Sequence, residues 1–229
     1  GDQHAAHRQD RPQRVAEDVA PDAGRPRQPA TGRDLHVLPA ELLGALRQGS
    51  RKVTTSQPPP AAFAAAYRRA AAAGAGLLLE TPTWRANHDW GARLGVGADG
   101  LAGANAAAVG LVAGLARQYA DTVPEVAVAG MVGPRGDGYV PGEAMDPWQA
   151  RDYHLPQARV FADEGADLLT ALTLTTADEA IGVVLAARAV GLPVSVGFTV
   201  ETDGRLPDGT SLRAAVEGVD DVSPPDWFV

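Results

Sequence analysis

The chain has 229 residues, of which 45% are hydrophobic and 5% aromatic, so it is long enough to form one sizeable α/β core. Its net charge of −8 creates a field that repels nucleic acid and anionic membrane surfaces, so we expect neither as a partner. The sequence contains no cysteine, which excludes disulfides, thiolate nucleophiles and any cysteine-ligated zinc site formed by these residues alone.

No stretch approaches about 18 uninterrupted apolar residues, and the first residues lack the apolar centre of a signal peptide. We therefore expect a cytoplasmic protein without a membrane span.

The first part of the chain differs in composition from the rest. Residues 1–60 are polar, rich in Arg, Gln, Asp and Pro, and show no periodicity. Such a segment buries too little apolar area to offset the entropy of ordering. We expect a disordered or irregular head over residues 1–60, followed by an ordered domain over residues 61–229.

Helices and strands alternate from residue 61 onward. Strands are predicted at 77–79, 126–131, 167–172 and 193–200, with the start of a fifth at 227–229. Helices are predicted at 61–73, 88–95, 98–120, 146–164, 177–190 and 211–218. The leucine run at 77–79 is typical of a strand buried on both faces.

Two of the helices carry more detailed expectations. In the helix over 98–120, we expect Leu111 and Val112 among the residues of the buried side. In the helix over 146–164, Pro156 should kink the helix or break its hydrogen-bond ladder.

The alternation predicts a parallel sheet with helices on its faces. Polar loops with ligand-capable side chains follow each strand, at 83–87, 133–139, 173–176 and 199–203. That repetition favours a (β/α)₈ barrel, in which all strand carboxyl ends converge on one mouth. A doubly wound sheet is the alternative, although no GxGxxG or P-loop follows any strand. With four strands and the start of a fifth, we predict a partial TIM barrel.

Several polar residues allow both a structural and a functional interpretation. Thr83 or Asn87 could simply cap the helix that follows the first strand. Glu201 and Asp203 could form a carboxylate pair, although residues at such positions more often cap a turn. His88 and His154 are more often structural at helical positions. The His, Asp and Glu residues show no zinc-binding spacing.

Four segments together resemble the homocysteine S-methyltransferase family, namely ETPTWRAN, GPRGDGY, YHLPQARVFADEGADLL and DEAIGVVLAARAVGLPVSVGFTVETDGRLPDGTSL. The resemblance runs from about Ala61 to Asp220. It implies a TIM barrel with zinc at its mouth, where the metal would bind a thiol such as homocysteine and lower its pKa. The implied reaction transfers a methyl group from an S-methylmethionine-like donor, a betaine-like donor or a methylated cofactor to that thiol, giving methionine.

The resemblance also implies a set of residues at the mouth. Thr83, within Glu80-Thr81-Pro82-Thr83, would help to hold the polar end of the amino acid. The loops that carry Asp137, Tyr139 and Asp203 would lie beside the substrate. The expected substrate-binding residues are therefore Glu80, Thr83, Asp137, Tyr139 and Asp203, and no metal ligand or catalytic residue is assigned.

The sequence departs from the family pattern at important positions. The family holds zinc with three cysteines, one after the sixth strand and two after the eighth, and this chain has none. Many members carry a glutamate for the homocysteine amino group where this chain has Leu172. Either the amino group is bound in another way, or the thiol or selenol substrate differs. The alternative to an active methyltransferase is a catalytically inert, truncated half-barrel or pseudoenzyme.

Residues 1–60 do not contain the Asp-Gly-Gly loop that ends the family's first strand. We hypothesise that a shifted reading frame or wrongly placed gene boundaries account for two features: the unusual head, and an end at Val229, where the sixth strand is expected. A half-barrel would leave an open edge beside residues 194–200, so we also expect self-association through that edge.

Overall fold

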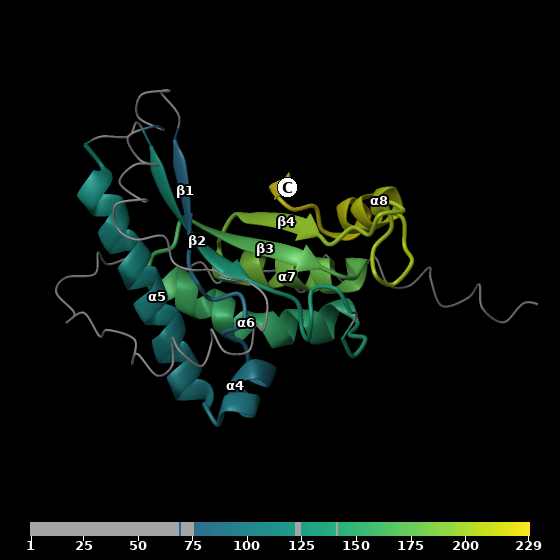
Figure 1. The fold of residues 1–229 in the computed structure, drawn as a ribbon, viewed down its shortest axis with the longest axis horizontal. Coiled ribbons are helices and arrows are strands. Elements are labelled where there is room, and N and C mark those ends of the chain that lie inside the picture. Colours follow the sequence, from purple (N-terminus) through teal and green to yellow (C-terminus); the bar gives the residue numbers. More distant parts are fainter. Residues whose placement is uncertain (1–68, 70–75, 122–124, 141) are drawn as a thin grey trace, which may run out of the picture.

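The computed structural model describes residues 69, 76–121, 125–140 and 142–229, so the predicted head and nearly all of the predicted helix over 61–73 lie outside it. The described chain forms one parallel sheet (Figure 1). Its strands are β1 (Leu77–Glu80), β2 (Val126–Val132), β3 (Leu168–Leu174), β4 (Val194–Phe198) and β5 (Trp227–Phe228). Its helices are α4 (His88–Leu94), α5 (Ala98–Tyr119), α6 (Pro147–Asp163), α7 (Ala177–Val190) and α8 (Leu212–Val222).

The strands lie in the sheet in the order in which they occur in the chain, and each is parallel to the next. A doubly wound sheet would instead reverse its strand order at a switch point and carry helices on both faces. Here the core cluster joins α5, α6, α7 and α8 to one face of the sheet. The structure is the wall of an open barrel, which confirms the predicted partial TIM barrel.

Two aspartates align neighbouring strands at the amino-terminal edge of the sheet. Asp167 accepts the backbone N–H of Val128 at 2.8 Å and returns its own N–H to the Val128 carbonyl at 2.8 Å. Asp226 does the same with Val194, at 2.8 and 2.9 Å. Each aspartate directly precedes the strand that it aligns, so the register of β3 on β2 and of β5 on β4 is set before the strand begins.

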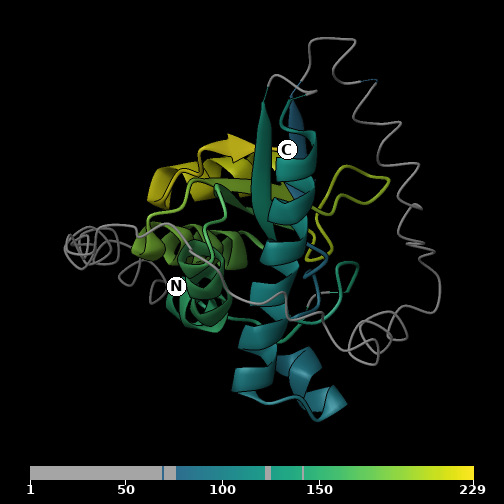
Figure 2. The same cartoon turned by 90° about the vertical axis from the view of Figure 1, so that its left-hand side faces the viewer.

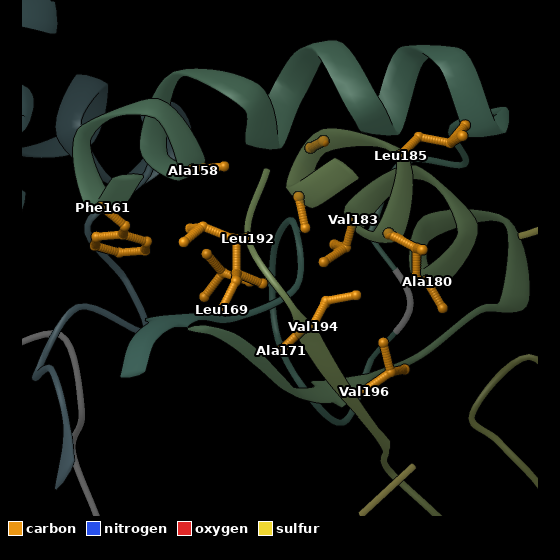
Figure 3. Packing of buried hydrophobic residues seen from close by; sticks show 14 of the residues in the cluster. Ala158, Phe161, Leu169, Ala171, Ala180, Val183, Leu185, Leu192, Val194 and Val196 are labelled. Carbon is orange, nitrogen blue, oxygen red and sulfur yellow. The ribbon is translucent and has the colours of Figure 1, made fainter. Parts of the chain in front are cut away.

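The core lies between the sheet and the layer of α6 and α7. Figure 3 shows Phe161 of α6 and Val183 of α7 above Leu169 and Val194 of the sheet, all of them fully buried. Phe161 occupies space that a side chain at Gly130 would need, because a Cβ there would collide with the ring. The absence of a side chain in the middle of β2 therefore lets α6 lie close against the sheet.

The prediction that residues 77–79 are buried on both faces is wrong. Leu79 packs against the core cluster, but Leu78 is 50% exposed. Side chains of a strand alternate between its faces, so Leu78 points to the face opposite the helices. In the described part of the chain, β1 lies at the edge of the sheet and this face has no covering layer beside it.

One helix prediction also needs correction. Leu111 of α5 is 40% exposed, whereas Val112 is buried as predicted. The other buried residues described in α5 are Ala104, Asn105, Ala108 and Val109. Helix α6 continues through Pro156, whose missing N–H leaves one gap in the hydrogen-bond ladder, as predicted.

Helix α5 is the one described helix that is long and apolar enough to cross a membrane by length and composition, over Ala98–Arg117. About a quarter of this stretch, 28%, is buried. Figures 1 and 2 show α5 alongside β1 and β2, and it contacts both strands as well as α6. A single helix of this composition is weak evidence for a membrane span, since a core helix meets the same criteria.

We expect Gly130→Ala to lower the free energy of unfolding by about 1–3 kcal/mol, because the new methyl group must displace the Phe161 ring. The matched control is Gly103→Ala in α5, where an added Cβ meets no atom within 4 Å. That control should raise stability by about 0.5–1 kcal/mol, since alanine favours a helix. Urea denaturation of both variants checks this, and equal midpoints would contradict it.

Candidate functional site

The carboxyl ends of the parallel strands meet at one edge of the sheet, where the loops after β1, β2, β3 and β4 come together. We call this edge the mouth, with residues 81–87, 133–140, 142–146, 173–176 and 199–211. Sites in barrels of this kind are built at the same edge.

Three hydrogen bonds among Thr81, Thr83 and Met131 form a closed ring at the start of the first mouth loop. The N–H of Met131 donates to Thr81 Oγ1 at 2.8 Å, and Thr83 Oγ1 donates to the Met131 carbonyl at 2.6 Å. The two threonine hydroxyls lie 2.6 Å apart, so Thr81 must be the donor between them. This ring continues the pairing of β1 and β2 beyond the last strand residue, and it holds the first loop rigidly.

The indole of Trp84 crosses from the first loop to the end of β3. Its Nε1–H donates to Thr173 Oγ1 at 2.9 Å. Two glycines make room for the ring: a Cβ on Gly133 would lie 2.5 Å from the indole, and one on Gly138 would lie 3.2 Å from it. Trp84 thus holds three loops together; a side chain at Gly133 would collide with the indole, and one at Gly138 would require a small shift of Trp84 and Thr173.

Thr173 has φ of 60°, the left-handed region, and is the one non-glycine residue with positive φ among the described residues. For a β-branched residue this conformation is a real outlier and costs about 1–3 kcal/mol. The pairing of β3 with β4 shifts register between Ala171 and Leu174, around Thr173. The strained residue therefore lies in a bulge that turns its hydroxyl toward Trp84.

The loop after β4 joins the same network. Thr199 is buried, and its hydroxyl donates to the Gly138 carbonyl at 2.5 Å. Together with the Trp84 contacts, this bond ties the loops of all four strands to each other, so the mouth is one connected structure.

Arginines and aromatic rings stack on the outer side of Trp84. The Arg85 guanidinium lies 4.5 Å from the centre of the Trp84 ring and 4.7 Å from that of Trp90. Arg85 Nη2 lies 4.0 Å from Asp137 Oδ2, and the side chain of Arg85 is 19% exposed. Desolvation by burial lowers the pKa of Arg85, with the Asp137 charge opposing that shift. Two rings therefore hold this cation beside a carboxylate at the rim of the mouth.

A second arginine fixes the loop after β2. Arg135 Nε donates to Asp89 Oδ2 at 2.9 Å, and its guanidinium also pairs with Glu143 at 3.0 Å. Burial alone would raise the pKa of Asp89, but the hydrogen bond and charge of Arg135, together with His88, outweigh it and hold the pKa below its ordinary value. The pair joins this loop to α4.

Glu179, in the first turn of α7, holds the same loop by a hydrogen bond to its backbone. Its side chain is 5% exposed, and Oε1 accepts the backbone N–H of Arg135 at 2.6 Å. The same oxygen lies 3.0 Å from Nε2 of His154, whose ring is fully buried in α6. A buried carboxylate thus joins α6, α7 and the mouth.

The five expected substrate-binding residues all lie at or beside the mouth, in different environments. Glu80 ends β1; it is exposed, and desolvation by neighbouring atoms raises its pKa. Thr83 is 2% exposed and its hydroxyl proton is used within the ring. Asp137 accepts the N–H of the exposed Tyr139, and Asp203 accepts that of Arg205, so both aspartates shape turns. Their contacts with a substrate stay a prediction.

Helix capping explains part of the first loop, since Asn87 Oδ1 accepts the N–H of Trp90 and caps α4 as predicted. Glu179 is the residue that sequence reasoning missed. Trp84 and Thr173 lie in the polar loops 83–87 and 173–176 that the sequence singles out, but their contact was not predicted, because the two residues are 89 positions apart. Nothing local in the sequence marks Glu179, whose partner Arg135 lies 44 residues away.

Two hollows open on the described surface. One of about 410 Å³ adjoins the mouth and is lined by residues of the loops after β2, β3 and β4, including Arg135, Thr175 and Asp208. A wider one of about 630 Å³ lies at the opposite edge, around Leu78 and Asp167. The first adjoins the strand carboxyl ends, where barrel sites are built, but its lining includes neither Arg85 nor any of the five expected substrate-binding residues.

The described residues include no group of three or more His, Cys, Asp or Glu side chains that could hold a metal ion. The zinc implied by the sequence resemblance needs three protein ligands at a catalytic site. The described side chains of the mouth therefore do not fit a zinc ion.

We expect Glu179→Ala to lower the free energy of unfolding by about 3–5 kcal/mol, because it leaves the Arg135 N–H and His154 without their buried partner. The control is Glu217→Ala, whose exposed carboxylate meets Arg213 at 3.5 Å and should change stability by less than about 0.5 kcal/mol. Chemical denaturation measures both. A Glu179→Ala protein as stable as the control would contradict the anchoring role.

The lowered pKa of Asp89 predicts a pH-dependent contribution to stability. A carboxyl with a depressed folded pKa stabilises the fold at neutral pH, and loses that effect as pH falls through the folded pKa. Asp89→Asn should therefore cost up to about 1 kcal/mol at pH 7, and the difference from wild type should shrink below about pH 4. Thermal melts between pH 3 and pH 7 test this, and a pH-independent difference would disprove it.

The comparisons with known proteins agree with this architecture. The family model described as homocysteine S-methyltransferase matches residues 30–229, so the match includes part of the expected head. No curated protein sequence matches the chain. Among solved structures, the metallated form of the homocysteine methyltransferase MmuM from Escherichia coli is similar, with a TM-score of 0.59 and 20% identity. That likeness covers 79% of this chain and 68% of the MmuM chain.

The oxidized form of MmuM gives a TM-score of 0.58 at 22% identity, and the apo form gives 0.53 at 20%. Likeness at such identity shows a shared fold, which here is the MmuM barrel over about two thirds of its length. The family match covers most of the sequence. The chain belongs to the homocysteine S-methyltransferase family.

Proposed function

We propose that this chain binds the amino-acid thiol of a homocysteine S-methyltransferase reaction at its mouth. The reaction transfers a methyl group from a donor to a thiol such as homocysteine and gives methionine. The observation that carries the proposal is the network that joins four strand-end loops, three through Trp84 and the fourth through the Thr199–Gly138 hydrogen bond, at the edge of the sheet where barrel enzymes bind substrates. The family match supports the same reaction class.

The chemistry demands a thiolate placed in line with the methyl group. The sulfur forms a bond to the methyl carbon as the bond from that carbon to the donor atom breaks, and the thiol proton leaves to solvent before the attack. Holding both reactants in this geometry is a large part of catalysis in such a displacement. A mouth whose loops are joined by hydrogen bonds is suited to holding both reactants, because it does not need to reorganise around the substrate.

Some described residues of the mouth hold its loops in place, and others are exposed and can contact a substrate. Thr81, Thr83 and Trp84 are buried or half-buried and hold the loops in place. Asp137 is half-exposed beside Arg85, at a position where it can meet a solute. Glu80, Tyr139 and Asp203 are exposed at the same edge, and we propose them as further contacts of the amino acid or the donor.

The test is methionine formation by the purified full-length chain, measured by mass spectrometry. Homocysteine is supplied with S-methylmethionine, betaine or methyltetrahydrofolate in parallel, with and without added zinc. The proposal expects turnover with at least one donor, and Trp84→Ala should reduce kcat/KM by at least about tenfold. Trp148→Phe, in the first turn of α6, is the matched control and should keep activity.

The alternative is an inert chain, and the same assay decides between them. Absence of methionine with every donor, together with absence of homocysteine binding by calorimetry, would overturn the proposed function. Homocysteine binding without turnover would leave the substrate-binding part standing and would contradict only the activity.

A further inference from the structure

Thr173 is an unexpected residue for its backbone conformation. Glycine or asparagine adopts the left-handed region at low cost, whereas a β-branched side chain adopts it only when the surroundings impose it. What threonine adds at this position is a hydroxyl that accepts the Trp84 indole N–H at 2.9 Å and donates to the Leu172 carbonyl at 2.5 Å. The strain and the hydrogen bond occur at the same residue.

Trp84 in turn determines where Arg85 lies. The indole is fixed by Thr173 on one side and by the close approach of Gly133 and Gly138 on another. The Arg85 guanidinium stacks on that ring and also lies 4.7 Å from the centre of the Trp90 ring. Contact of a planar cation with two rings restricts the orientation of its N–H groups.

Arg85 and Asp137 form a pair of opposite charges 4.0 Å apart at the rim of the mouth. An α-amino acid carries a carboxylate and an ammonium group on the same carbon, so its head group matches such a pair in sign and in scale. The fork of a guanidinium suits a carboxylate in particular. Asp137 comes from the loop after β2, which Thr199 and Arg135 tie to the rest of the mouth.

We propose that Thr173 is a positioning residue, which acts through Trp84 to hold Arg85 and Asp137 as a binding site for the zwitterionic head group of an amino-acid thiol. The inference rests on the proposed function and adds to it the group that binds the substrate carboxylate, the Arg85 guanidinium.

Three variants separate the hydroxyl from the strain. Thr173→Val keeps the branched shape and removes the hydroxyl, whereas Thr173→Ser keeps the hydroxyl. Thr170→Val is the matched control on the same strand, because the Thr170 hydroxyl is buried and has no hydrogen-bond partner among the described residues.

The first measurement is hydrogen exchange of the indole N–H groups by NMR in the full-length chain. The chain has four tryptophans, and the Trp84→Phe variant assigns the Trp84 signal. We expect exchange at Trp84 to be about tenfold faster in Thr173→Val, and unchanged in Thr173→Ser and Thr170→Val. Unchanged exchange in Thr173→Val would overturn the positioning role, and this result does not depend on any substrate.

The second measurement is binding of homocysteine and of 3-mercaptopropylamine, the same thiol without its carboxylate. Thr173→Val should weaken homocysteine binding about tenfold and leave the weaker binding of 3-mercaptopropylamine unchanged, with rescue by Thr173→Ser. An equal loss for both thiols would overturn the carboxylate assignment. If the wild-type chain binds neither thiol, the proposed function and the head-group site both fail, while the exchange result still decides the link between Thr173 and Trp84.

Discussion

The structure depends on close contact between α6 and its neighbours, which two glycines permit. Gly130 in β2 leaves the space that the Phe161 ring fills, and Gly182 in α7 allows the backbone of α6 to approach at Ala150. A protein interior is packed densely enough that one added carbon in such a place must displace its neighbours. These two positions set the distance of α6 from the sheet and from α7, and with it the place where the loop after β2 ends.

Glycines also make room for an aromatic ring at the mouth, but there the result is different. Gly133 and Gly138 make room for the Trp84 indole as Gly130 does for Phe161, but here the ring brings a polar N–H to a strained partner, Thr173. The core gains burial from its aromatic ring, whereas the mouth gains a fixed orientation. The cost of the left-handed threonine is compatible with the fold because the hydrogen bonds and close contacts around it leave no other arrangement.

Much of the fold is predictable from the sequence. Alternating patterns, capping residues such as Asn87 and terminating glycines such as Gly191 place the helices and strands within a few residues, since these signals are local. The exposure of Leu78 and Leu111 was not predictable, because it depends on which face of an element meets another. The same holds for the site: Trp84 with Thr173, and Glu179 with Arg135, are joined only by the completed fold.

The sequential order of the strands has a consequence for how the chain folds. Each strand pairs with the strand that precedes it, and an aspartate directly before β3 and β5 already fixes the alignment. No pairing in the described sheet therefore waits for a strand that is synthesised later than the next one in the chain. During synthesis the sheet can therefore grow strand by strand from its first edge, with each new unit docking onto one that has already emerged from the ribosome.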